Sequence, residues 1–169
     1  EDLIKEICDT GTPVIVVLIN GSAITMTKWI DGVKAILEAW YPGEEGGNAI
    51  ADILFGDYNP GGKLPITFPR YTGQLPLYYN YKPSGRVDDY VDLRGPQPLF
   101  PFGYGLSYTQ FRYSNLRINP EKIGIDEDIN ISFDIENIGK YKGDEVVQLY
   151  LHDLFASVAR PVKELKRFK

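Results

Sequence analysis

Two apolar runs near the start of the chain predict buried strands. Residues 14–19 (VIVVLI) are apolar throughout and mostly β-branched, a pattern typical of a central strand in a parallel sheet. Residues 33–40 form a second, largely apolar run that is short enough for a strand buried on at least one face. Turn-forming residues follow both runs, at 20–22 (NGS) and 42–43 (PG). Because ligands of open α/β sheets lie beyond the carboxyl ends of the strands, we expect these two turns to form the rim of a crevice.

The apolar spacing changes to that of a helix after the second turn. From residue 47 the apolar side chains share one helical face, and Gly56 stands where a C-cap glycine belongs; the face consists of Ala49, Ile50, Ile53 and Leu54. A glycine-rich turn at 59–62 then precedes a third predicted strand, residues 64–68. Strand, helix and strand over residues 33–69 predict a βαβ unit, in which a helix covers a parallel sheet.

The first nine residues also have helical spacing. Leu3, Ile4, Ile7 and Cys8 share one face, so we expect a short helix with Cys8 as a small core hydrophobe rather than a nucleophile. Residues 23–31 are ambiguous between a short extended piece and a helical turn, and Met26 is expected to serve in packing.

A period of two begins at Phe111. Apolar and polar residues alternate through 129–136 and again through 147–152, which predicts antiparallel strands with one buried and one solvated face. Further strands are expected at 113–118 and near 162–168. An immunoglobulin-type sandwich needs about seven strands and about 100 residues. Only 59 residues follow Gln110, so the sequence predicts an incomplete sandwich.

These patterns predict an α/β fold, a mostly parallel sheet with covering helices in an α/β sandwich, followed by an incomplete antiparallel β-sandwich. We expect the α/β domain to occupy residues 1–110 and the truncated sandwich to occupy residues 111–169. Within the first domain, residues 71–110 form a region rich in tyrosine, proline and glycine. A connection of this length without periodicity is often functional or a docking surface.

Charge and composition restrict the kinds of partner. The net charge of -5 argues against a nucleic-acid partner, because no excess of cations is available to neutralise phosphates. No apolar run approaches the length of a membrane helix, and the first residues (EDLIKEI) are not a signal peptide. The single cysteine excludes an internal disulfide framework, so the sequence leaves the compartment open between the cytoplasm, the periplasm and the exterior.

The residues for cofactor chemistry are missing. The only histidine is His152, and the acidic triplet 126–128 lacks the spacing of a calcium loop, so we expect no metal. The glycine loop at 43–47 contains two glutamates and no following lysine, which disfavours a phosphate, and no dinucleotide or P-loop motif is present. We expect no cofactor.

One long motif makes the chain recognisable. The block WYPGEEGGNAIADILFGDYNPGGKLPITFP, residues 40–69, closely resembles the signature of the C-terminal α/β domain of family 3 glycoside hydrolases, the β-glucosidase and β-xylosidase group. Residues 99–109 (LFPFGYGLSYT) resemble the family's link to its final module, and the alternating region after Phe111 resembles a fibronectin type III-like domain. Tyr78 to Tyr81, with Arg86 and the Asp88-Asp89 pair, resembles the xylosidase-like branch.

The resemblance implies the C-terminal part of a retaining exo-β-glycosidase that releases glucose or xylose from the non-reducing end of β-linked substrates. In such enzymes the nucleophilic aspartate comes from an N-terminal (β/α)₈ barrel and the acid/base glutamate from a segment upstream of residue 1. Neither maps onto this sequence, so the resemblance implies no catalytic residue here and a fragment without activity of its own. A non-catalytic module that uses residues 71–110 to hold carbohydrate or a partner domain is the alternative.

The adjacent pair Glu44-Glu45 does not replace the missing acids. Retention requires two carboxyl groups about 5–5.5 Å apart across one bond, and consecutive residues of a turn generally point apart. Glu45 is expected to accept hydrogen bonds from amides of the loop or of the helix N-terminus. The signature loop is therefore expected to be mainly structural; its residues are Trp40, Gly43, Glu45, Gly46 and Gly47.

Overall fold

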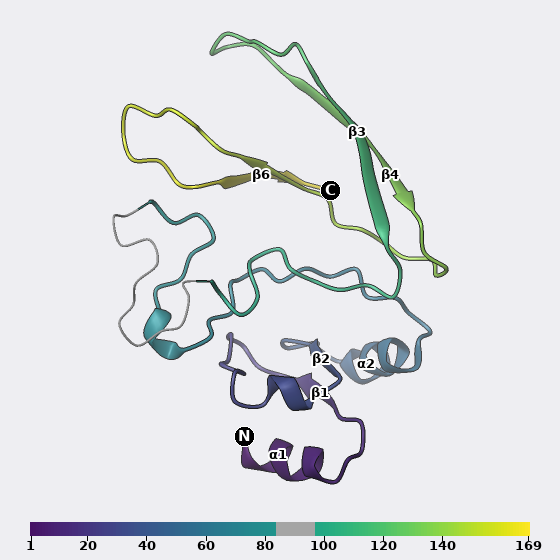
Figure 1. Ribbon diagram of the computed structural model, residues 1–169. Helices are drawn as coiled ribbons and strands as arrows, with labels where there is room; N and C mark the ends of the chain where they lie inside the picture. Colours follow the sequence, from purple (N-terminus) through teal and green to yellow (C-terminus); the bar gives the residue numbers. More distant parts are fainter. Residues whose placement is uncertain (84–96) are drawn as a thin grey trace.

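The computed structural model describes residues 1–83 and 97–169. Figure 1 shows the helices and the parallel strands at one end of the molecule and the β-hairpins at the other. Two extended segments of chain run between these ends. The elements in order are α1 (Asp2–Asp9), β1 (Ile15–Leu18), a 3₁₀ turn (Ile30–Gly32), β2 (Ala35–Glu38), α2 (Gly46–Phe55), a second 3₁₀ turn (Thr72–Gln74), β3 (Phe111–Asn119), β4 (Asn130–Asn137), β5 (Gln148–Leu151) and β6 (Glu164–Phe168).

The two predicted apolar strands form and lie parallel. β1 pairs with β2 in register from Ile15 opposite Ala35 to Leu18 opposite Glu38. One face of this pair packs on the core, to which Val16, Leu18 and Ile36 contribute. The opposite face leaves Ile15 and Ile19 more than half exposed, an unusual state for a parallel sheet.

Both predicted helices of the first half are also present. α2 ends at Gly56, whose φ of 87° is left-handed and whose N–H donates to the Ile53 carbonyl, as expected of a C-cap glycine. α1 contains no buried residue. Cys8 on α1 is half-buried rather than a member of the core, and its thiol donates to the Gly32 carbonyl at 3.3 Å.

The third strand expected at residues 64–68 does not form, so the prediction of a βαβ unit over 33–69 is wrong. Leu64 and Phe68 bond instead to the returning segment: the Leu64 N–H donates to the Tyr104 carbonyl and the Phe68 N–H to the Phe100 carbonyl, both at 2.8 Å. The ladder between these segments amounts to one isolated antiparallel bridge, between Phe68 and Phe100. Pro65 and Pro69 lack the N–H that a longer ladder needs.

The core lies between the parallel pair and this returning segment. Phe68 and Met26 are each 1% exposed and Trp29 is 6% exposed. The Phe68 ring lies between Trp40, at a centroid distance of 5.9 Å, and Phe100, at 6.3 Å. Met26 therefore packs as expected. Residues 23–31, which the sequence left ambiguous, supply two of the three most buried apolar side chains within residues 1–83 and 97–169.

The second half of the chain consists of two hairpins. β3 pairs antiparallel with β4, and β5 pairs antiparallel with β6, each as a separate two-stranded sheet. The alternation predicted for β4 is present in part: Ile131 and Phe133 are partly buried, whereas Ile135 is 41% exposed. The acidic residues 126–128 lie in the exposed connection between β3 and β4, as expected of a solvated turn.

Replacing Phe68 tests the position of the core. We expect Phe68→Ala to lower the free energy of unfolding by about 3–5 kcal/mol, because the change leaves a cavity against Trp40 and Phe100. Phe55→Ala is the matched control, since Phe55 is 85% exposed, and it should change stability by less than about 0.5 kcal/mol. Chemical denaturation of both variants measures the difference; equal losses would contradict this assignment of the core.

Candidate functional site

The signature loop leaves β2 through a backbone conformation that few residues adopt. Trp40 has a φ of 52°, and its N–H donates to Oε1 of Glu38 at 3.1 Å. Gly43 follows with a φ of 75°, and its carbonyl accepts the N–H of Gly46 at 3.2 Å. Gly46 is buried against Pro42, so the loop folds back on itself before α2 begins. The structure thus brings together the loop residues that the motif singled out.

Glu45 does not make the hydrogen bonds expected of it. It occupies the N-cap of α2 without a side-chain bond to the helix amides. Its Oε2 accepts instead from Nδ2 of Asn48 at 2.6 Å, because a glutamate side chain extends beyond the N2 and N3 amides that shorter capping residues reach. Glu44 and Glu45 are both exposed on the loop.

A polar pair lies at the carboxyl ends of β1 and β2, where the sequence motifs did not indicate one. Oδ1 of Asn20 and Oε2 of Glu38 are buried acceptors without a donor among the described residues. Burial raises the pKa of the Glu38 carboxyl above its ordinary value, and the hydrogen bond from the Trp40 N–H and the neighbouring Asn20 side chain partly offset this shift. The signal available in the sequence was the position of Glu38, an acidic residue at the end of an apolar predicted strand.

The turn after β1 contacts the signature loop directly. Tyr41 lies against Gly21, where an added Cβ would approach the ring to 2.7 Å. The Tyr41 side chain is otherwise 77% exposed. The two turns predicted to form one rim are therefore in contact.

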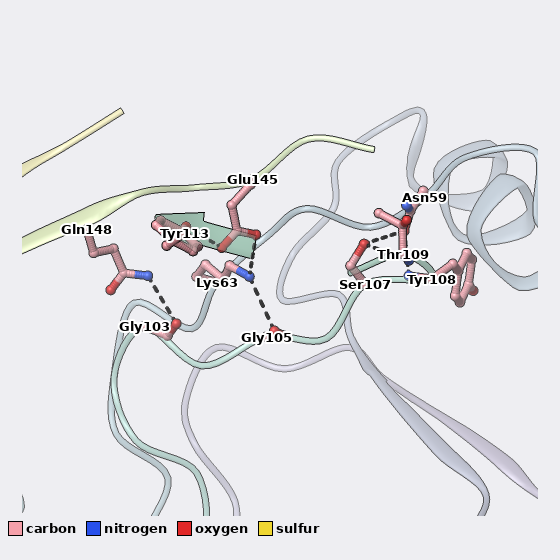
Figure 2. Close-up of polar contacts among 10 residues, drawn as sticks. All are labelled: Asn59, Lys63, Gly103, Gly105, Ser107, Tyr108, Thr109, Tyr113, Glu145 and Gln148. Atoms are coloured by element: carbon pink, nitrogen blue, oxygen red, sulfur yellow. Dashed lines mark hydrogen bonds and ion pairs between the residues drawn. The ribbon is translucent and has the colours of Figure 1, made fainter. Parts of the chain in front are cut away.

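A second group of polar residues connects the extended segments to the hairpins, and we call this contact region the junction. Oδ1 of Asn59 accepts from the Ser107 hydroxyl at 2.9 Å and from the Tyr108 N–H at 2.8 Å, while its Nδ2 donates to the Lys142 carbonyl at 3.0 Å. Figure 2 shows Asn59 with Ser107, Tyr108 and Thr109 around it. One amide thus ties three segments that lie far apart in the sequence.

An ion pair holds the other end of this junction. Nζ of Lys63 lies 3.2 Å from Oε2 of Glu145, and both side chains are more than four-fifths buried. The Tyr113 hydroxyl donates to Oε1 of the same carboxylate at 2.8 Å. Burial and this carboxylate raise the pKa of Tyr113 to about 12. Gln148 donates to the Gly103 carbonyl at 3.1 Å alongside, as Figure 2 shows.

The part of the chain that the structure describes contains neither a metal-ligand cluster nor a helix suited to spanning a membrane. No group of three histidine, cysteine, aspartate or glutamate side chains is placed there to hold a metal ion. His152 lies exposed just after β5. Within residues 1–83 and 97–169, no helix has the length and apolar character to cross a membrane. Arg86, Asp88 and Asp89 lie outside the described residues.

Comparison with known families agrees with this architecture. Residues 1–108 match the model of the glycosyl hydrolase family 3 C-terminal domain, and residues 145–169 match that of the fibronectin type III-like domain. The chain belongs to glycosyl hydrolase family 3, through the family's C-terminal domain. The resemblance stated from the signature block is confirmed.

Similar proteins are β-glucosidases and β-xylosidases. A periplasmic β-glucosidase of Salmonella typhimurium is 46% identical over 99% of this chain and 23% of its own length, and a β-xylosidase of Formosa agariphila is 44% identical over 100% and 24%. A β-glucosidase structure from Erythrobacter marinus superposes with a TM-score of 0.93 at 45% identity, over 99% of this chain and 22% of that one. A Listeria innocua β-glucosidase in complex with isofagomine gives 0.91 at 39% identity, over 99% and 25%. The chain spans about a quarter of the length of these relatives.

Two neighbouring glycines test the folding of the signature loop. In Gly46→Ala the new Cβ would lie 2.5 Å from Cγ of Pro42, so we expect a loss of about 1–3 kcal/mol of unfolding free energy. Gly47→Ala meets nothing within 4 Å and should be neutral or stabilising by up to about 1 kcal/mol, because alanine favours the helix. Urea denaturation compares the two; a Gly47→Ala loss as large as that of Gly46→Ala would refute the packing described.

The Glu38 carboxyl predicts a pH-dependent effect. Its raised pKa means that the folded state binds this proton more tightly than the unfolded chain, so its contribution to stability falls as pH rises from the ordinary value of 4.5 through the raised one. Glu38→Gln removes the buried charge and keeps an acceptor for the Trp40 N–H. The variant should therefore gain stability relative to the wild type as the pH rises from 4.5 toward neutrality. A difference between the two proteins that stays constant over this range would contradict the assignment.

Proposed function

We propose that this chain is the C-terminal part of a retaining exo-β-glycosidase that removes terminal glucose or xylose from β-linked substrates. The observation that carries the proposal is the family 3 match over residues 1–108, to which the β-glucosidase and β-xylosidase relatives add alignments over almost the whole chain. We call the longer protein the parent enzyme. One relative is periplasmic by name, which supports a parent that works outside the cytoplasm.

In the parent, residues 1–110 would belong to an α/β sandwich domain and residues 111–169 to a fibronectin type III-like β-sandwich. The parallel pair of β1 and β2 would then be part of a larger, mostly parallel sheet with covering helices. The exposed apolar face at Ile15 and Ile19 supports this, because parallel sheets are normally covered on both faces. The hairpins β3–β4 and β5–β6 would be the part of the sandwich that this chain carries.

In the parent enzyme this chain would line one side of the substrate pocket and support the neighbouring domains, and it would not supply the catalytic residues. Glu44 and Glu45 are exposed on one loop, and the Glu45 carboxylate is bonded to Asn48, which supports a structural role for the pair. The nucleophile would come from an N-terminal (β/α)₈ barrel, the partner domain of this chain, and no cofactor would be required. The signature loop would contact the substrate pocket through Trp40, Gly43, Glu45, Gly46 and Gly47 only as a supporting surface.

Hydrolysis of aryl glycosides tests the proposal. We expect the purified 169-residue chain to release no nitrophenol from aryl β-glucosides or β-xylosides, whereas the parent enzyme should release it readily. A folded sample, verified by circular dichroism, is the necessary control. Robust turnover by the isolated chain would overturn the assignment of the catalytic acids to another domain, and an inactive parent would overturn the activity itself.

A further inference from the structure

A pocket lies at the junction between the extended segments and the hairpins. It is shallow and open to solvent, with a volume of about 410 Å³. Five parts of the chain line it: Lys63, residues 101–104, Tyr113, four residues between 145 and 150, and Lys163 next to β6. Figure 2 shows Lys63, Tyr113 and Glu145 turned toward one another in this region, and Gln148 beside them with its amide directed to Gly103.

Aromatic rings are held at the pocket without being buried. The Tyr104 ring stacks on Phe100 at a centroid distance of 5.1 Å, and the Tyr113 ring stacks on Phe133 at 5.9 Å. Tyr104 nevertheless remains 37% exposed and Tyr113 48% exposed. Rings fixed by neighbouring rings and still partly open to solvent present a rigid apolar surface to a ligand.

The polar groups of the pocket are fixed in place by each other. Lys63 donates to Glu145 and to the Gly105 carbonyl, and the second carboxylate oxygen of Glu145 accepts from Tyr113. Gln148 donates to the Gly103 carbonyl and accepts from the Tyr150 hydroxyl at 2.5 Å. A ligand would therefore meet ordered donors and acceptors side by side, without a cost for ordering them first.

Charge decides which ligand suits this arrangement. The Glu145 carboxylate offsets the Lys63 ammonium and would repel a phosphate or another strong anion. The exposed Lys163 ammonium lies over the Tyr150 ring, 5.0 Å from its centroid, so the lining holds one ammonium beyond the Lys63–Glu145 pair among its rings, amides and hydroxyls. A sugar matches such a surface, because its ring presents an apolar C–H face and a rim of hydroxyls that both donate and accept hydrogen bonds.

We propose that this pocket is a non-catalytic binding site for a short neutral oligosaccharide. A second sugar site at the junction would hold part of a longer glycan on the enzyme. The choice of β-linked glucose and xylose oligomers as probes rests on the proposed function; the pocket itself does not.

Calorimetric titration of the parent enzyme tests the site. The catalytic pocket is first saturated with isofagomine, the ligand held by the Listeria innocua relative, and cellotriose or xylotriose is then added. We expect residual binding of one sugar per chain. Tyr104→Ala should weaken this binding about fivefold, because the stacking surface is lost. Tyr141→Ala, which removes a 63% exposed ring outside the pocket lining, should change it less than twofold.

Three outcomes would overturn the proposal: loss of all oligosaccharide binding on saturation with isofagomine, equal weakening by both tyrosine variants, or no change in either. If Tyr104→Ala does not fold, photo-crosslinking of the wild type with a diazirine-bearing xylotriose replaces it. Label on residues 101–104 or 145–150 supports the site, and label elsewhere refutes it. Nitrophenol release is measured separately, so a loss of glycosidase activity is distinguishable from a loss of this site.

Discussion

The structure depends on the hydrogen bonds between two extended segments, residues 64–68 and 99–104. The N–H groups of Leu64, Phe68 and Gly103 each donate across this contact at 2.8 Å, and the Leu99 N–H adds a fourth bond at 2.9 Å. The contact joins two segments that lie far apart in the sequence, and it places the Phe68 ring between Trp40 and Phe100. Without it, the inner face of the β1–β2 pair would lose the cover that Phe68 and Phe100 provide, and so short a sheet is not stable alone.

The same two segments carry the hairpins on their other side. Lys63 and Asn59 precede one segment and donate to Glu145 and to the Lys142 carbonyl, respectively. Ser107 follows the other segment and donates to Asn59. A buried ion pair of this kind adds little net stability, because desolvation of the two charges offsets their attraction. Its stronger effect is on geometry, since either charge left unpaired would be costly. The junction therefore fixes how the first half of the chain meets the second, and it creates the pocket between them.

The sequence predicted what depends on local pattern. The strands at 15–18 and 35–38, α2 with its Gly56 cap, and the strands of both hairpins follow from apolar period and turn residues. The error at 64–68 arose because its partners lie more than 30 residues away and because Pro65 and Pro69 limit pairing, which local spacing does not reveal. Local sequence analysis could not identify Asn59 either, because its role depends on hydrogen bonds to Ser107 and Lys142, which lie far away in the sequence. Glu38 became a candidate only when its burial was known.

Amide hydrogen exchange tests the central role of the segment contact most directly. If residues 64–68 and 99–104 hold the core and the junction together, the amides of Leu64, Phe68 and Gly103 will be protected as strongly as those of β1 and will exchange with them as one cooperative unit. Rapid exchange of these three amides while β1 and β2 stay protected would show that the core persists without the contact, and would contradict the account.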